Sequence, residues 1–165
     1  MHTTRMLLLL SSMVHFASCR RAGRTAAPAA ADDSAFGAMQ SRGAAAMGVD
    51  QYTSSHRFEP RPDGGRIVLQ RDVDDSAGVA EIRRHLQGIA VAFQRGRFDT
   101  PAFVHAMAVP GTAVMAARQD AIGYIYRDLP RGGEVRITSR DSVAVAAIHE
   151  FLGFQRTDHR VEMGH

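Results

Sequence analysis

The sequence predicts an α+β domain in which a β-β-α unit occurs twice, giving a four-stranded antiparallel sheet with two long helices packed on one face. Three observations support this fold class. Gly64-Gly65 and Gly132-Gly133 each separate two short segments of alternating apolar residues, as in a β-hairpin. An Asp-Ser pair follows each hairpin, and a stretch with helical apolar spacing follows each pair. Short helices are expected in the segment that links the two units.

Residues 1–18 have the features of a signal peptide. "MHTTR" is a short basic region, and "MLLLLSSMVHFA" is an apolar run below the roughly 20 residues that a membrane-spanning helix needs. "FASC" resembles the bacterial lipobox, so Cys19 is expected to be lipidated and to become the first residue of a lipoprotein. The alternative is ordinary secretory cleavage, with Cys19 as an inert or lost thiol. Either route exports the chain, and lipidation would hold it on the periplasmic face of a bacterial membrane.

Residues 19–50 are predicted to be a flexible, lipid-anchored tether. Ala, Gly, Ser and Arg dominate this stretch, and few large apolar side chains are available to offset the entropy cost of ordering. Its alanines could form a transient helix. Residues 51–165 then form a single α+β domain.

The part predicted to fold is nearly neutral. Residues 51–165 carry fifteen arginines against fourteen acidic residues, although the whole chain has a net charge of +3. A nucleic-acid-binding protein would show a dense basic stripe interleaved with stacking aromatic residues. We therefore expect no nucleic acid as partner, and expect instead the membrane, a protein partner or a second copy of the chain.

The first unit begins with a strand that contains His56 and Phe58 on one face, followed by the turn and a strand with Ile67 and Leu69 on one face. Asp75-Ser76 is suited to cap the helix that follows, because a carboxylate there accepts hydrogen bonds from free backbone N–H groups. The helix is predicted from apolar residues at i, i+3, i+7, i+10 and i+14: Val79, Ile82, Leu86, Ile89 and Phe93.

The linking segment contains two helix starts. One is Asp99 or Thr100 before Pro101, and the other is Pro110-Gly111-Thr112. One of these short helices is expected to cover the second face of the sheet, or a homodimer would cover it.

The second unit repeats the plan of the first. Val135 and Ile137 align with the apolar pair of the earlier strand, and Tyr124 aligns with the strand histidine. Asp141-Ser142 is the corresponding cap. The helix after it carries its apolar residues at matching positions: Val145, Ile148 and Leu152.

Common catalytic motifs are missing from the sequence. It contains no Gly-rich phosphate loop, H-E-x-x-H zinc motif, nucleophile elbow or Cys-x-x-Cys pair. We therefore predict a protein that is not an enzyme. An enzyme with a histidine general base is the alternative, since tertiary contacts could place a partner beside an imidazole.

Histidines are the candidate ligands for a metal ion. In an exported protein whose cysteine is lipidated, histidine and methionine are the remaining ligands for soft transition metals such as copper. Strand, helix and linker could bring four of them to one end of the sheet: His56, His85, His105 and His149. Met107 lies two residues after His105, and His159 returns to the buried face if the last helix continues that far.

Several segments resemble a family of small exported bacterial proteins and lipoproteins. "MGVDQYTSSHRF" is similar to the family opening "MGFDQ…THHF", and "AIHEFLGFQRTDH" is similar to its ending "AIHDFLRFQ…H". The resemblance covers about residues 47–160 and implies export and a fold, without an activity. Arg57 stands where the family has the second histidine of its strand pair. The remaining family histidines fall on His56, His85, His105, His149 and His159.

Two function hypotheses follow from the sequence. The first is a membrane-tethered protein of the cell envelope with a non-catalytic binding or structural role. The second is a periplasmic copper-type metal-binding protein that uses the four candidate histidines.

Overall fold

The computed structural model describes residues 26–161, with side chains placed from Asp32 onward. Residues 1–18, predicted to be a signal peptide, and Cys19 lie outside this range. No helix within the described residues is long and apolar enough to cross a membrane. The elements are, in order, α1 (Ala26–Met47), η1 (Gln51–Thr53, a 3-10 turn), β1 (Ser54–Arg61), β2 (Gly64–Arg71), α2 (Ser76–Gln94), α3 (Asp99–His105), α4 (Thr112–Ala117), η2 (Gln119–Ala121, a second 3-10 turn), β3 (Ile122–Leu129), β4 (Gly132–Ser139) and α5 (Ser142–Asp158).

The four strands form one antiparallel sheet in the order β1-β2-β4-β3. The α+β class and the four-stranded antiparallel sheet are therefore confirmed. In the central pair, Ile67 of β2 lies opposite Val135 of β4. In the outer pairs, His56 of β1 lies opposite Leu69, and Tyr124 of β3 lies opposite Ile137. β1 and β3 are the two edge strands.

The helix starts agree with the sequence signals. The Asp75 carboxylate accepts a hydrogen bond from the backbone N–H of Gly78 at 3.0 Å, and Asp141 accepts one from Val143 at 2.9 Å. These bonds satisfy N–H groups that have no partner inside the first turn of a helix. The short helices α3 and α4 begin at Asp99 and Thr112, as predicted.

The two hairpin turns differ in a way that the sequence did not indicate. Gly64 has a φ of 134° in the first turn, but in the second turn Arg131 takes the left-handed conformation, with a φ of 58°. Gly132 is required for a different reason, because a Cβ atom there would overlap the carbonyl oxygen of Leu69 on β2. Gly132 therefore permits close approach of the two central strands, β2 and β4.

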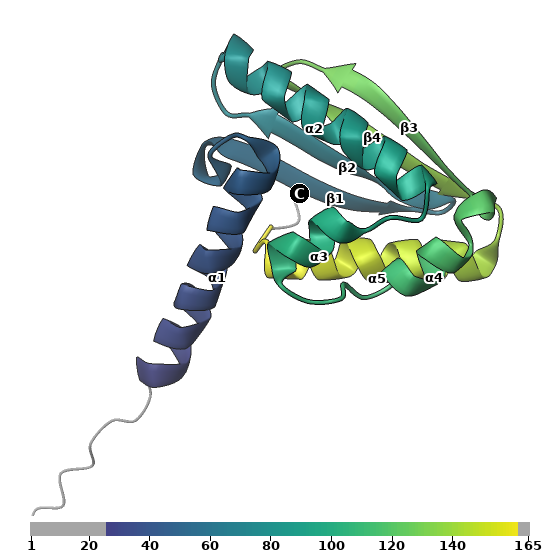
Figure 1. Cartoon of the computed structure of the whole chain (residues 1–165), viewed down its shortest axis with the longest axis horizontal. Helices are drawn as coiled ribbons and strands as arrows, with labels where there is room; N and C mark the ends of the chain where they lie inside the picture. Colours follow the sequence, from purple (N-terminus) through teal and green to yellow (C-terminus); the bar gives the residue numbers. More distant parts are fainter. Residues whose placement is uncertain (1–25, 162–165) are drawn as a thin grey trace, which may run out of the picture.

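One hydrophobic cluster joins the sheet to both long helices. As Figure 1 shows, α2 runs along β4 and β3, and it packs mainly on these two strands, whereas α5 packs mainly on β1 and β2. Ile82 and Leu86 of α2 and Ile148 and Leu152 of α5 are fully buried, as their spacing predicts. The hydrophobic cluster therefore fixes the positions of α2 and α5 on the sheet.

The second face of the sheet carries charged pairs. Residues that alternate with the core residues place Arg66 between Glu59, at 2.9 Å, and Glu134, at 3.1 Å. The short helices do not cover this face as expected, since α3 lies against α1 and α4 lies against α5. An antiparallel sheet with one polar face is a common arrangement.

Residues 26–47 form helix α1, which differs from the flexible tether expected over residues 19–50. Alanine has the highest helix propensity, so an Ala-rich stretch becomes helical once a few side chains can pack. Met39 and Met47 are buried, and Arg42 Nε donates a hydrogen bond to the carbonyl oxygen of Val104 at 2.7 Å. The C-terminal half of α1 belongs to the folded body, and its N-terminal half projects away from the sheet (Figure 1).

Candidate functional site

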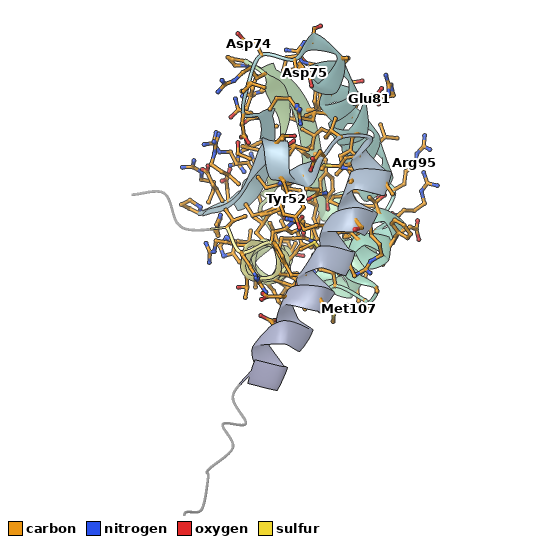
Figure 2. The ribbon with its side chains drawn as sticks, turned by 90° about the vertical axis from the view of Figure 1, so that its left-hand side faces the viewer. Tyr52, Asp74, Asp75, Glu81, Arg95 and Met107 are labelled. Atoms are coloured by element: carbon orange, nitrogen blue, oxygen red, sulfur yellow. The ribbon has the colours of Figure 1, made fainter. Side chains whose placement is uncertain are left out.

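A partly open cavity of about 80 Å³ lies beneath the C-terminal end of α1. α1 and η1 form one wall, and β1, β2, α2, α3 and α5 form the others. In Figure 2, α1 runs in front of the side chains of the body, and the labelled Tyr52 of η1 lies near its C-terminal half. The volume is several times the roughly 10–15 Å³ that a single water molecule needs.

Four histidines from four different elements line this cavity. They are His56 on β1, His85 on α2, His105 at the end of α3 and His159 directly after α5. Three of them belong to the set predicted as metal ligands. Their convergence depends on α5 crossing over β1, which brings the C-terminal end of that helix above the first edge strand.

His56 and His159 pack on each other as stacked rings in the cavity wall. Their centroids are 5.2 Å apart at an interplanar angle of 25°, and Phe58 lies 5.3 Å from the ring of His159. Burial lowers the pKa of His56 to about 4, with a smaller contribution from nearby His85. Burial also lowers the pKa of His159 to about 3, with help from His56 and His105. Both rings are therefore neutral at physiological pH.

The tautomer of His85 is set by helix α1. Its Nδ1 lies 3.2 Å from the carbonyl oxygen of Ala46, which can only accept, so Nδ1 carries the proton and donates. Burial lowers the pKa of His85, although this hydrogen bond opposes the effect. In the neutral ring Nε2 is left as a hydrogen-bond acceptor.

His105 has partners on both ring nitrogens. Nδ1 bonds to the carboxylate of Asp158, and Nε2 lies 3.0 Å from the side-chain amide of Gln155. The ring is 8% exposed and packs edge-on against Phe154 and His159. His105 therefore holds the end of α5 against α3, and it presents no unbonded nitrogen to the cavity.

Gln51 adds an amide to the cavity wall. Its side chain is 6% exposed, and its Oε1 has no hydrogen-bond partner within residues 26–161. The amide packs against Gly43 of α1, where a Cβ atom would overlap it. Asp50 fixes the turn that carries Gln51 by accepting a hydrogen bond from the backbone N–H of Tyr52 at 2.8 Å.

Most of the remaining wall is apolar. Leu69, Leu86, Phe93 and Phe151 contribute hydrocarbon surface, and Met47 of α1 contributes a thioether. In such surroundings an unpaired polar atom is costly, because neither water nor a nearby dipole compensates for its desolvation. The polar atoms of Gln51, His56 and His159 are thus the unusual feature of an otherwise apolar wall.

His149 does not belong to this site, contrary to the predicted set. It follows the fully buried Ile148 by one position, so it points about 100° away from the buried stripe of α5. Its Nε2 donates a hydrogen bond to the carbonyl oxygen of Arg61 at 2.9 Å, at the turn of the first hairpin. His149 therefore has a local structural role.

Gln51 lies in the predicted domain but has no sequence signal that marks its amide as buried, whereas Met47 was missed because residues 19–50 were interpreted as a tether. A helical signal is nevertheless present in that stretch. Phe36, Met39, Gly43 and Met47 follow one another at i, i+3, i+7 and i+11, which places two buried methionines and the contact glycine on one face of α1. The surrounding alanines hide this pattern, because they make every face of the helix weakly apolar.

The arrangement offers neutral imidazoles, a thioether and an amide around a small apolar space. Neutral imidazole is the form that binds metal ions, and it can also donate or accept a hydrogen bond. Among the described residues, no group of three or more His, Cys, Asp or Glu side chains is arranged to hold a metal ion. The predicted metal site thus stays a prediction.

Comparisons with known proteins add no family to this description. No family model matches the chain, and no curated protein and no solved structure is significantly similar to it. The resemblance to exported bacterial proteins therefore stays an expectation, and the function has to be argued from the cavity.

Proposed function

We propose that this protein is a membrane-tethered component of the bacterial cell envelope that binds a small ligand in the histidine-lined cavity without transforming it. The N-terminal sequence supports the location, since a signal-peptide pattern is followed by a lipobox-like "FASC" at Cys19. The chain then leads within a few residues into α1, which forms one wall of the cavity.

The observation that carries the binding role is the convergence of polar side chains on one cavity. His56, His85, His159 and Gln51 line it, and the Oε1 atom of Gln51 is buried without a hydrogen-bond partner within residues 26–161. An unsatisfied buried polar group destabilises a fold by about 1–3 kcal/mol. A ligand that supplied the missing hydrogen bonds would offset this cost, so the cavity is better suited to binding than to packing.

Two properties of the histidines favour binding over catalysis. A general base works best when its pKa is near the working pH. Burial holds the pKa values of His56 and His159 at about 4 and about 3, which makes both imidazoles weak bases. His105 has the carboxylate partner that a catalytic histidine would use, but both of its nitrogens are already bonded.

A copper-type metal ion is the second candidate ligand. Met47 supplies a thioether to the cavity wall that also holds His56, His85 and His159. Thioether and neutral imidazole suit Cu(I), and an apolar surrounding excludes water from the ion.

We also infer that the two β-β-α segments arose by duplication, with both long helices on one face of the sheet. An offset of 68 residues aligns Ile67 with Val135, and these two residues lie opposite each other in the central strand pair. The same offset aligns His56 with Tyr124, each opposite a core residue of the inner strand. A pseudo-twofold axis between β2 and β4 would produce this register.

The proposed function is tested on the full mature chain, because α1 is part of the cavity wall. Cu(I), Cu(II), Zn(II) and small organic probes are titrated while the ring resonances of His56 and His159 are followed by NMR. At least one probe is expected to shift both, and His56→Ala is expected to weaken its binding at least tenfold, whereas the control His149→Ala leaves it unchanged. If no probe perturbs these histidines, the binding role is wrong.

The metal candidate and the membrane tether have separate readouts. One Cu(I) per chain, lost in His56→Ala and retained in His149→Ala, is the result expected for a copper protein; the absence of stoichiometric binding removes that candidate. Incorporation of a labelled fatty acid into the wild type, and its loss in Cys19→Ala, is expected for the tether. A chain that is exported without label contradicts lipidation.

A further inference from the structure

The polar atoms of the cavity differ in the hydrogen-bonding group that they require from a ligand. Gln51 Oε1 is an acceptor without a partner in the described part of the chain, and it belongs to a side chain that is 6% exposed. His85 Nε2 is a second acceptor, because the Nδ1 of that ring donates to Ala46. Both residues line the cavity. A ligand that reached these two acceptors would have to donate hydrogen bonds to them.

His56 and His159 impose no fixed requirement. A neutral imidazole has one donor and one acceptor nitrogen, and the proton can occupy either nitrogen. The two stacked rings therefore adapt to a ligand group that accepts or donates. Together with the two fixed acceptors, they suit a molecule with several N–H or O–H groups and a carbonyl-like acceptor.

The surroundings disfavour a charged organic ligand. Phe93, Phe151, Leu69 and Leu86 make most of the wall apolar, and no carboxylate or arginine is among the described lining residues. Transfer of an ion into such a space has a large desolvation cost unless a counter-charge is present. The cavity volume of about 80 Å³ is also roughly half of the 150 Å³ that accommodates a benzene molecule in a model protein. The ligand must therefore be uncharged and smaller than a six-membered ring.

We propose that the cavity binds a small uncharged molecule of the primary amide or urea class, with N–H groups donated to Gln51 Oε1 and His85 Nε2. This inference rests on the proposed binding function and specifies its ligand chemistry. The Gln51 acceptor lies opposite helix α1 at Gly43, so formation of the site depends on that helix being docked.

Four probes of nearly equal shape separate the possible ligand classes. Acetamide is neutral and both donates and accepts, acetone is neutral and only accepts, acetate is an anion, and acetamidinium is a cation. Each has four heavy atoms, which limits the binding free energy to about 6 kcal/mol at best. The probe concentration is therefore raised to roughly tens of millimolar. The titrations use the full mature chain, and the ring resonances of His56 and His159 are the readout.

Acetamide is expected to bind at least tenfold more tightly than acetone, because acetone would leave both acceptors unpaired at about 1–3 kcal/mol each. Tighter binding of acetate or acetamidinium overturns the inference, as does equal binding of acetone and acetamide. If none of the four binds, the ligand class is wrong. Binding of Cu(I) in the same experiment would then show that the proposed binding function survives.

A substitution at Gln51 tests the named contact. Gln51→Leu keeps the size of the side chain and removes the acceptor, so the affinity for acetamide is expected to fall about tenfold while that for acetone stays unchanged. His149→Ala, outside the cavity, is expected to change neither. Should Gln51→Leu fail to fold, His85→Leu, which removes the other named acceptor, is used for the same comparison. An unchanged preference for acetamide in both variants contradicts the proposed contacts.

Discussion

The two edges of the sheet use the same arrangement with different side chains. At the β1 edge, the ring of His56 packs on His159 at the end of α5, with 5.2 Å between centroids. At the β3 edge, the ring of Tyr124 packs on Phe93 of α2 at 5.8 Å. Phe93 continues into contacts with Phe98 and Phe151, so the β3 edge is filled by aromatic rings. The β1 edge borders the cavity, to which Phe93 and Phe151 contribute hydrocarbon surface and His56 and His159 contribute imidazoles.

This difference separates side chains that are needed for packing from side chains that are available for binding. The β3 edge shows that a helix can pack on an edge strand through aromatic rings that consist mostly of hydrocarbon. The histidines at the β1 edge are therefore not required for packing. Helix α1 contacts α2, α3 and η1 and forms one wall of the cavity. The comparison predicts that substitutions at the β3 edge mainly lower the stability of the fold, and that substitutions at the β1 edge mainly weaken ligand binding.

The largest effect is expected at the β3 edge. Phe93 is 1% exposed and contacts three other aromatic rings, so Phe93→Ala should lower the free energy of unfolding by about 3–5 kcal/mol. His159→Ala removes a ring that already borders empty space and should cost less than half as much. Chemical denaturation of the two variants measures both values. A larger loss in His159→Ala would reverse the assignment of the two edges.

The second effect is a pH dependence that arises at the β1 edge. The folded-state pKa values of His56 and His159 lie below the value of about 6.5 for a free imidazole, so the unfolded chain binds more protons in this range. The free energy of unfolding should fall as the pH is lowered from 6.5 towards 4, by up to about 1.4 kcal/mol per pH unit for each ring.

Denaturation series of the wild type and of His56→Phe, at several pH values, measure this slope. The variant should lose roughly half of it, and His149→Ala serves as the matched control because its ring lies outside the cavity. Equal slopes in wild type and His56→Phe would show that His56 is not buried as described.

The third effect comes from making the β1 edge resemble the β3 edge. The double variant His56→Phe with His159→Phe fills part of the cavity of about 80 Å³ and removes unpartnered nitrogens. We expect it to be more stable at pH 7 by about 1 kcal/mol and to lose binding of acetamide. Thermal unfolding with and without acetamide tests both expectations. A double variant that is destabilised by about 2 kcal/mol or more would show that the histidines are packing residues after all.

The smallest effect is expected at Tyr124. Its hydroxyl group is buried without a partner within the described residues, and burial raises the pKa of this phenol well above its usual value. Tyr124→Phe removes the unsatisfied group, so the free energy of unfolding should stay the same or rise by up to about 1 kcal/mol. A clear loss of stability in denaturation experiments would show that this hydroxyl has a partner at the β3 edge.

The sheet and the helix starts could be predicted because their signals are local. Alternation around Ile67 and Val135 specifies strands, and the carboxylates of Asp75 and Asp141 cap the helices that follow them. The position of α1 could not be predicted in this way. Its buried residues, Met39 and Met47, are sparse among alanines, and tertiary contacts with α2, α3 and η1 make the helix part of the body.

The site could be predicted only in part, because it depends on which strands each helix crosses. His159 lies seven residues after Leu152, on the buried stripe of α5, and the crossing over β1 brings it to His56. His149 is just off that stripe and reaches the hairpin turn instead. Helical periodicity separates these two histidines, but the distance between strand and helix rings is a tertiary property.

The central claim is that His56 and His159 line one cavity beneath α1 and are held neutral there. A pH titration of the histidine ring resonances by NMR, on the full mature chain, tests it most directly. Half-protonation of His56 near pH 4 and of His159 near pH 3 is the predicted result. Titration of both rings near pH 6.5 in the folded protein would contradict it, because it would show that the two imidazoles are open to water.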